Sequence, residues 1–142
     1  MNARQQGSTV SPAAQARGSG QRVAERWTAL TLLAVVGGFQ LALVTGAPWG
    51  AAAWGGLAPG VLPMPLRIAS LASLVIYCGL GGLVASPRLH PTTRRRLLTG
   101  ASLVMVLGTI GNVATQSPVE RIWAPVSAAL AVLLWRLRTA SV

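Results

Sequence analysis

The sequence predicts an all-α fold, a four-helix transmembrane bundle with a long outer loop between its first two helices. Of its 142 residues, 52% are hydrophobic and 10% are charged, whereas a soluble domain carries about 25% charged residues. Four apolar runs each approach the roughly 20 residues that cross about 30 Å of hydrocarbon. Ten of the twelve arginines lie in three blocks that flank these runs. A chain with so little charge requires lipid as its solvent.

The first element is a disordered cytoplasmic tail, expected at residues 1–20 because Gly, Ser, Gln, Ala and Arg dominate there without apolar periodicity. The membrane domain is expected at 21–138, with spans at about 27–44, 68–85, 97–114 and 119–137, and a short cytoplasmic tail at 139–142. Helices are expected because backbone groups in lipid must be satisfied within the segment. A signal peptide cleaved after Ala47 is the alternative for the first run, but that run exceeds the roughly 7–15 residues of such a peptide.

The arginines predict the orientation of the spans. Ten of them fall in the N-terminal flank, the loop after span two and the C-terminal flank, and only Arg67 and Arg121 fall in the other two loops. Because arginine-rich flanks stay in the cytoplasm, both termini are predicted to be cytoplasmic. The predicted location is the inner (plasma) membrane, crossed several times.

The net charge of +10 raises the possibility of nucleic-acid binding, but the arginines flank apolar runs and do not line one polar face. The expected partners are the lipid bilayer, with its anionic headgroups at the arginine-rich inner side, and a membrane protein partner or a second copy of the chain. His90 is the only histidine and Cys78 the only cysteine. We therefore predict no metal, no cofactor and no disulfide, and we interpret Cys78 as a small buried packing residue.

Small residues recur within the spans and predict close helix packing. They are Ala34, Gly38 and Ala42 in span one, Ala69, Ser73, Gly79, Gly81 and Gly82 in span two, and Gly100, Gly108 and Gly111 in span three.

The first outer loop, about residues 45–66, contains tryptophan, glycine, proline and alanine and no charge. A loop in bulk water would be more polar. We expect this loop to lie in the membrane interface, with Trp49 and Trp54 at headgroup depth. A lid or binding loop with aromatic walls is the alternative.

The second outer turn predicts a capping box, in which Ser117 caps the helix, Pro118 opens it and Glu120 is the third helical residue. Glu120 is one of only two acids in the chain. The capping box gives Glu120 a structural role, and an ion pair between Arg67 and Glu120 would satisfy both side chains. The residues expected to gather on the outer face as a ligand or partner site are Gln40, Trp49, Trp54, Arg67, Asn112, Glu120 and Arg121.

Two sequence motifs support a resemblance that covers roughly residues 27–137. The first is Gly46–Gly50 with Trp54–Gly56, Leu62, Pro63, Leu66 and Arg67, and the second is Asn112, Thr115, Ser117, Glu120, Arg121, Trp123, Pro125 and Val126. On these residues the chain resembles a group of small four-span bacterial membrane proteins common in actinobacteria. The resemblance implies the topology and the outer-face cluster, and it implies no activity.

The sequence bears on three classes of function. The small size, the glycine-rich spans and the lack of a catalytic set favour a structural or accessory subunit that binds a membrane partner or lipid. The polar outer rim favours the alternative, an oligomeric small-solute transporter or channel. An enzyme is not predicted, because no Ser/His/Asp set, acidic metal cluster or phosphate loop occurs.

Overall fold

The computed structural model describes residues 11–86 and 88–139. Its elements in chain order are α1 (Pro12–Thr45), the short 3-10 turns η1 (Gly50–Ala52) and η2 (Trp54–Gly56), α2 (Met64–Ala85), α3 (Pro91–Ala114), the 3-10 turn η3 (Glu120–Ile122) and α4 (Trp123–Leu137). The described residues contain no strand, and the predicted all-α fold with four helices is confirmed.

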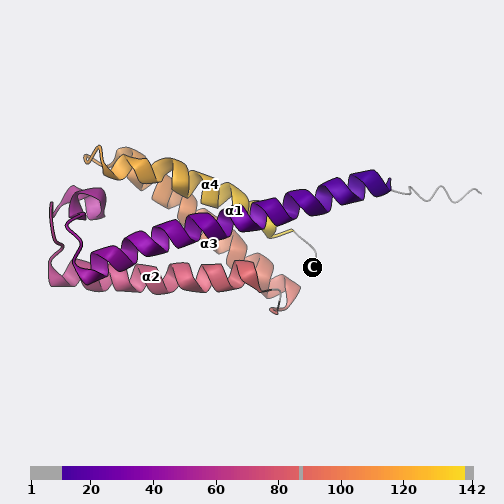
Figure 1. Cartoon of the computed structure of the whole chain (residues 1–142), viewed down its shortest axis with the longest axis horizontal. Coiled ribbons are helices and arrows are strands. Elements are labelled where there is room, and N and C mark those ends of the chain that lie inside the picture. Colours follow the sequence, from indigo (N-terminus) through magenta and orange to yellow (C-terminus); the bar gives the residue numbers. More distant parts are fainter. Residues whose placement is uncertain (1–10, 87, 140–142) are drawn as a thin grey trace, which may run out of the picture.

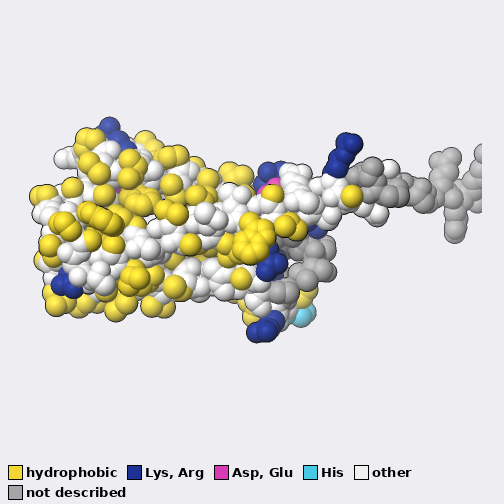
Figure 2. Space-filling view, viewed as in Figure 1, with side chains coloured by type: hydrophobic (Ala, Val, Ile, Leu, Met, Phe, Trp, Pro, Cys, Tyr) yellow, Lys and Arg dark blue, Asp and Glu magenta, His cyan; other side chains and the backbone are white. Residues whose placement is uncertain are grey.

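Three of the helices, α1, α2 and α3, are long and apolar enough to cross a membrane, and α4 is shorter, with 15 residues. At 1.5 Å per residue α4 is about 22 Å long. Large hydrophobic side chains are exposed along α2 and α3, among them Ile68, Leu71, Val75, Ile76, Leu103, Val104, Leu107, Ile110 and Val113. Figure 2 shows hydrophobic side chains over the body of the molecule and arginines toward its two ends. An apolar surface this extensive suits contact with lipid.

Helices α2, α3 and α4 end where the sequence predicted, but the starts of the helices differ from the prediction. Spans two to four were expected to end at residues 85, 114 and 137, and α2, α3 and α4 end there. Both α2, which begins at Met64, and α3, which begins at Pro91, start earlier than expected, each with a proline in its first turn. By contrast, α4 begins at Trp123, later than the expected residue 119, because the 3-10 turn η3 precedes it. The expected disordered tail is wrong for residues 12–20, which extend α1, since Ala, Gln and Arg favour a helix that the apolar run has already nucleated. Residues 1–10 and 140–142 of the two expected tails lie outside the described residues.

The helices pack as two antiparallel pairs (Figure 1). α1 packs mainly against α2 and α3 against α4, and α1 also contacts α4 and so joins the pairs. The N-terminal turns of α1 project beyond the other helices. We call the end that carries residues 46–63 the loop end, and the opposite end, which carries nine of the described arginines, the arginine end.

The two ends have separate apolar clusters. The larger one lies toward the arginine end and includes Leu33, Leu98, Leu130 and Leu134, each at most 3% exposed. The smaller one contains Leu43, Ala53 and Leu62 and seats the loop on α1. Polar groups lie between these clusters, at the level where the site described below is found.

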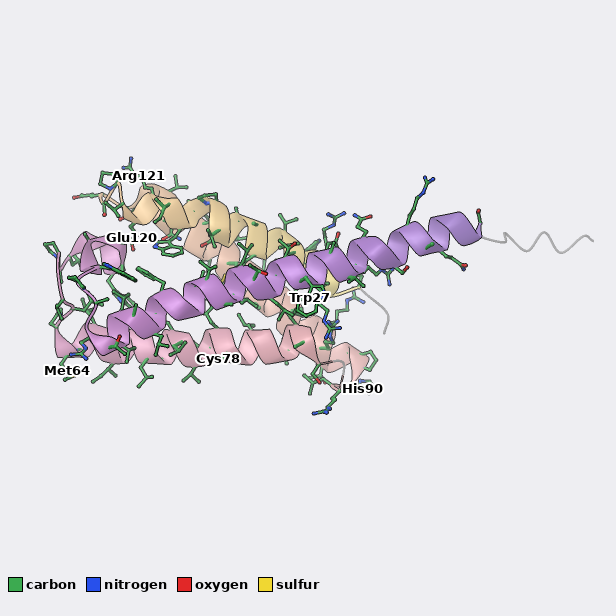
Figure 3. The ribbon with its side chains drawn as sticks, in the orientation of Figure 1. Trp27, Met64, Cys78, His90, Glu120 and Arg121 are labelled. Carbon is green, nitrogen blue, oxygen red and sulfur yellow. The ribbon has the colours of Figure 1, made fainter. Side chains whose placement is uncertain are left out.

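Two packing predictions are wrong for the described chain. Most of the glycines expected at helix contacts have open space around an added Cβ atom, namely Gly38, Gly79, Gly81, Gly82, Gly100 and Gly111. Cys78 is exposed on α2 and is not buried (Figure 3). In lipid an outward apolar face costs nothing, so hydropathy alone does not tell the inner face of such a helix from the outer one.

Each helix C-terminus receives an arginine from another segment. The acceptors are Val44 O for Arg67 (2.9 and 2.6 Å), Ala85 O for Arg26, Thr115 O for Arg121 (3.2 and 3.1 Å) and Leu137 O for Arg94 (3.0 Å). The last carbonyls of a helix have no partner within it and carry a partial negative charge. Because such groups are costly to bury in hydrocarbon, these arginines stabilise the helix ends.

Candidate functional site: a cavity beneath the loop

Backbone contacts within the loop give it a compact shape. Within it, Gly50 N donates to Gly60 O (2.9 Å), and a Cβ atom on Gly50 would lie 2.0 Å from Ala58 O. Only glycine allows so close an approach of two backbones. The loop therefore packs tightly against itself, which explains its content of small residues.

Four hydrogen bonds fasten the loop to the helices. Ser117 Oγ donates to Ala51 O (2.6 Å), Trp123 Nε1 to Ala52 O (3.0 Å), Gly55 N to Glu120 Oε1 (3.0 Å) and Trp54 Nε1 to Ser70 Oγ (3.1 Å). Three of these bonds reach the segment from Ser117 to Trp123, between α3 and the start of α4, and the fourth reaches α2. The loop thus bridges the two helix pairs at the loop end, as a lid would.

Glu120 is the centre of this attachment, and the expected capping box is only half formed. Its backbone N–H lies 3.4 Å from Ser117 Oγ, as a cap requires. Its carboxylate, however, accepts from Gly55 N (3.0 Å) and from Thr115 Oγ1 (2.6 Å), and not from Ser117 N, which donates to Thr115 Oγ1. The side chain is 9% exposed. It binds the loop because Gly55 N, a donor from the loop, takes the place of the Ser117 N–H that a capping box would use.

The expected ion pair between Arg67 and Glu120 does not form. Arg67 donates to Val44 O instead. Among the residues that the structure describes, the ion pair found is that of Arg136 with Glu25, at 3.1 Å and at the arginine end. Glu120 is therefore a buried carboxylate held by neutral donors.

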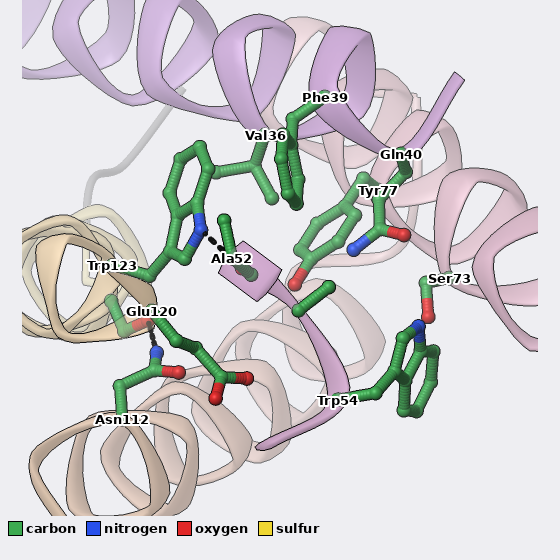
Figure 4. Close-up of a pocket in the computed structure, with 12 residues that line it drawn as sticks. Val36, Phe39, Gln40, Ala52, Trp54, Ser73, Tyr77, Asn112, Glu120 and Trp123 are labelled. Atoms are coloured by element: carbon green, nitrogen blue, oxygen red, sulfur yellow. Dashed lines mark hydrogen bonds between the residues drawn. The ribbon is translucent and has the colours of Figure 1, made fainter. Parts of the chain in front are cut away.

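A cavity of about 240 Å³ lies beneath the loop, and all four helices and the loop contribute to its walls. The lining residues are Val36, Phe39, Gln40, Ala52, Ala53, Trp54, Ser73, Tyr77, Asn112, Glu120, Trp123 and Ser127. Figure 4 shows Gln40 and Tyr77 directed toward a common space from one side and Glu120 from the opposite side. The cavity thus combines an aromatic surface with several convergent polar groups, as small-molecule sites do.

Local geometry fixes several of these walls. Trp54 has a left-handed backbone (φ 54°), which is uncommon for a large residue, and its indole is held by Ser70. Asn112 Nδ2 donates to Ser127 Oγ (3.1 Å), which links α3 to α4 inside the cavity. The amide oxygen of Gln40 is buried and has no hydrogen-bond partner. Such a group is costly unless a ligand or water satisfies it.

The structure divides the seven predicted site residues into two groups. Gln40, Trp54, Asn112 and Glu120 line the cavity together. The other three do not: Arg67 and Arg121 cap helix ends, and Trp49 is 52% exposed, with its ring stacked on Phe39 (centroids 6.3 Å apart).

Sequence reasoning did not include Phe39, Ser73, Tyr77, Trp123 and Ser127, which also line the cavity. A signal existed for two of them. Ser73 and Tyr77 are four residues apart on one face of α2, the face that also carries Ser70, the partner of Trp54. No comparable pattern distinguishes Phe39 from the other apolar residues of α1.

Comparison of the chain with protein-family models, with curated proteins and with solved structures finds no match. The resemblance to small four-span proteins therefore stays a prediction, and function has to be argued from the cavity itself. The lining offers one carboxylate, three hydroxyls and two amides among aromatic rings. These groups suit the binding and orientation of a small polar solute.

Proposed function

We propose that the chain is a four-span protein of the plasma membrane, with both termini in the cytoplasm, and that it binds a small solute in its outer half as a step in transport. The cavity beneath the loop carries this proposal, because residues from every helix converge on it. Solute sites in transporters lie between helices in this way, where polar groups are shielded from lipid.

Two further observations support the topology. The nine described arginines at one end and the two at the other follow the rule that positive charge stays inside. The short α4 pairs along α3 and follows η3 without a break, so η3 and α4 together suit a fourth crossing.

An accessory subunit is the second candidate, and the outward glycines favour it. Gly79 and Gly82 on α2 and Gly100 and Gly111 on α3 leave open space at the surface. A helix of a partner protein can approach closely at such positions.

Transport is tested with full-length protein in proteoliposomes, by counterflow of radiolabelled small amines, amino acids and sugars. We expect uptake of one solute class by the wild type. Ser73→Leu, which fills the cavity, should reduce this uptake to the level of protein-free vesicles. Ala72→Leu, which adds the same volume on the exposed side of α2, should leave it unchanged. Absence of uptake of every solute, or equal uptake by Ser73→Leu, would contradict the proposal.

A further inference from the structure

Glu120 is the only charged residue among those that line the cavity. The two arginines at the loop end are engaged with helix carbonyls, Arg67 with Val44 O and Arg121 with Thr115 O. Resting on the proposed function, we infer that the solute is a small organic cation with N–H donors, a protonated amine, and that Glu120 is its counter-charge.

The bonding of Glu120 leaves room for such a ligand. An ionised carboxylate offers about four acceptor positions, and Gly55 N and Thr115 Oγ1 occupy two of them. With the side chain 9% exposed, water solvates it poorly. A buried charge without an opposite charge is unfavourable, and a bound ammonium group supplies that charge at the remaining positions.

Aromatic rings provide the second element of cation recognition. Phe39, Trp54, Tyr77 and Trp123 line the same cavity as Glu120. The rings of Phe39 and Trp123 lie 4.6 Å apart, tilted by 47°, and hydrogen bonds from both indole N–H groups hold Trp54 and Trp123. The face of an aromatic ring attracts a cation, and most strongly where the cation is desolvated.

Unused acceptors select N–H donors over a fully alkylated cation. The Gln40 amide oxygen is buried without a partner, and Asn112, which donates through its nitrogen to Ser127, keeps its oxygen free to accept. A primary ammonium group has three donors, enough for Glu120 and one amide oxygen. The volume of about 240 Å³ is below the roughly 300–1,000 Å³ of drug-sized sites and favours a compact amine.

Three probes of one shape test the inference: protonated benzylamine, neutral benzyl alcohol and anionic benzoate, each titrated calorimetrically at pH 7 into the full-length protein in lipid nanodiscs. We expect the cation to bind most tightly and benzoate not to bind. Glu120→Gln should weaken binding of the cation about ten- to a hundredfold, as expected for the loss of a buried charged partner, and leave benzyl alcohol unaffected. Glu25→Gln, at the only other acid, is the control and should bind as the wild type does.

The inference is overturned if benzyl alcohol or benzoate binds as tightly as the cation, or if Glu120→Gln binds the cation with unchanged affinity. If Glu120→Gln does not fold, the relative affinities of the wild type for the three probes are sufficient to test the inference. Counterflow separates this inference from the proposed function. If Ser73→Leu blocks uptake of sugars or acids and the cation does not bind, the inference of a cationic solute is wrong, whereas the proposed transport through the cavity stands. If the cation binds in a way that depends on Glu120 but no solute is taken up, the inference of a cationic ligand stands and the proposed transport function is wrong.

Discussion

Glu120 joins three segments that are far apart in the sequence: η3, the end of α3 through Thr115, and the loop through Gly55. We expect Glu120→Ala to lower the free energy of unfolding by about 2–4 kcal/mol, because Gly55 N and Thr115 Oγ1 both lose a charged acceptor. Glu25→Ala removes a pair whose arginine is 52% exposed and should cost less than about 1 kcal/mol. Unfolding by SDS titration in mixed micelles measures both, and equal losses would contradict the role given to Glu120.

At the scale of the residue, the sequence predicts which side chains are available for a site but not the partners they use. Polar residues are rare near the ends of apolar runs, and this rarity identified Gln40, Asn112 and Glu120. Trp54 was identified by its place in the uncharged outer loop. The capping box was inferred from spacing of three residues, whereas the acceptor role of Glu120 depends on Gly55, 65 positions away. An ion pair of Arg67 with Glu120, the acid expected on the same outer face, was the natural prediction, because a backbone carbonyl acceptor cannot be recognised in a sequence.

Arginines from other segments donate hydrogen bonds to the last carbonyl groups of the helices. Arg67→Met should expose the unpaired carbonyl of Val44 and lower the free energy of unfolding by about 1–3 kcal/mol, because Arg67 donates to that group twice. Arg88→Met, at an exposed position between α2 and α3, serves as control and should stay within about 0.5 kcal/mol of the wild type. The same SDS titration measures both variants. An unchanged Arg67→Met would show that water already satisfies the carbonyl.

The ends of the helices were easier to predict than their starts. Apolar runs stop at the last helical residue, where Ser86 and Thr115 follow α2 and α3 as C-caps. The starts of α1 and α3 lie in polar turns, which a hydropathy pattern does not identify as part of a span. Residues 12–20 of α1 and 91–96 of α3 were therefore not predicted as helix. The inward and outward faces were not predictable, because both are apolar in a helix that lipid surrounds.

At the scale of the whole molecule, the arginine asymmetry predicts an outward loop end. In a Cys78→Ser background, Leu57→Cys in the loop, at a residue 82% exposed, should react with a membrane-impermeant maleimide on intact cells. Arg88→Cys at the arginine end should react only after the cells are opened. Labelling of Arg88→Cys on intact cells, with Leu57→Cys protected, would reverse the proposed orientation.

The cavity exists because the loop bridges two helix pairs that are joined chiefly by α1 and α4. Composition predicts helices and their number, but the space between the pairs depends on long-range contacts such as that of Trp123 with Ala52. This is why the sequence predicted the bundle and four of the lining residues without predicting the cavity that they line.

A small solute that occupies this cavity should change the fluorescence emission of the two tryptophans that line it. A variant with Trp27→Phe, Trp49→Phe and Trp135→Phe keeps only Trp54 and Trp123, which both line the cavity. Titrated in nanodiscs with protonated benzylamine, it should show a saturable change in emission that Ser73→Leu abolishes. Emission that stays constant, or that changes equally in the Ser73→Leu background, would contradict a solute site beneath the loop.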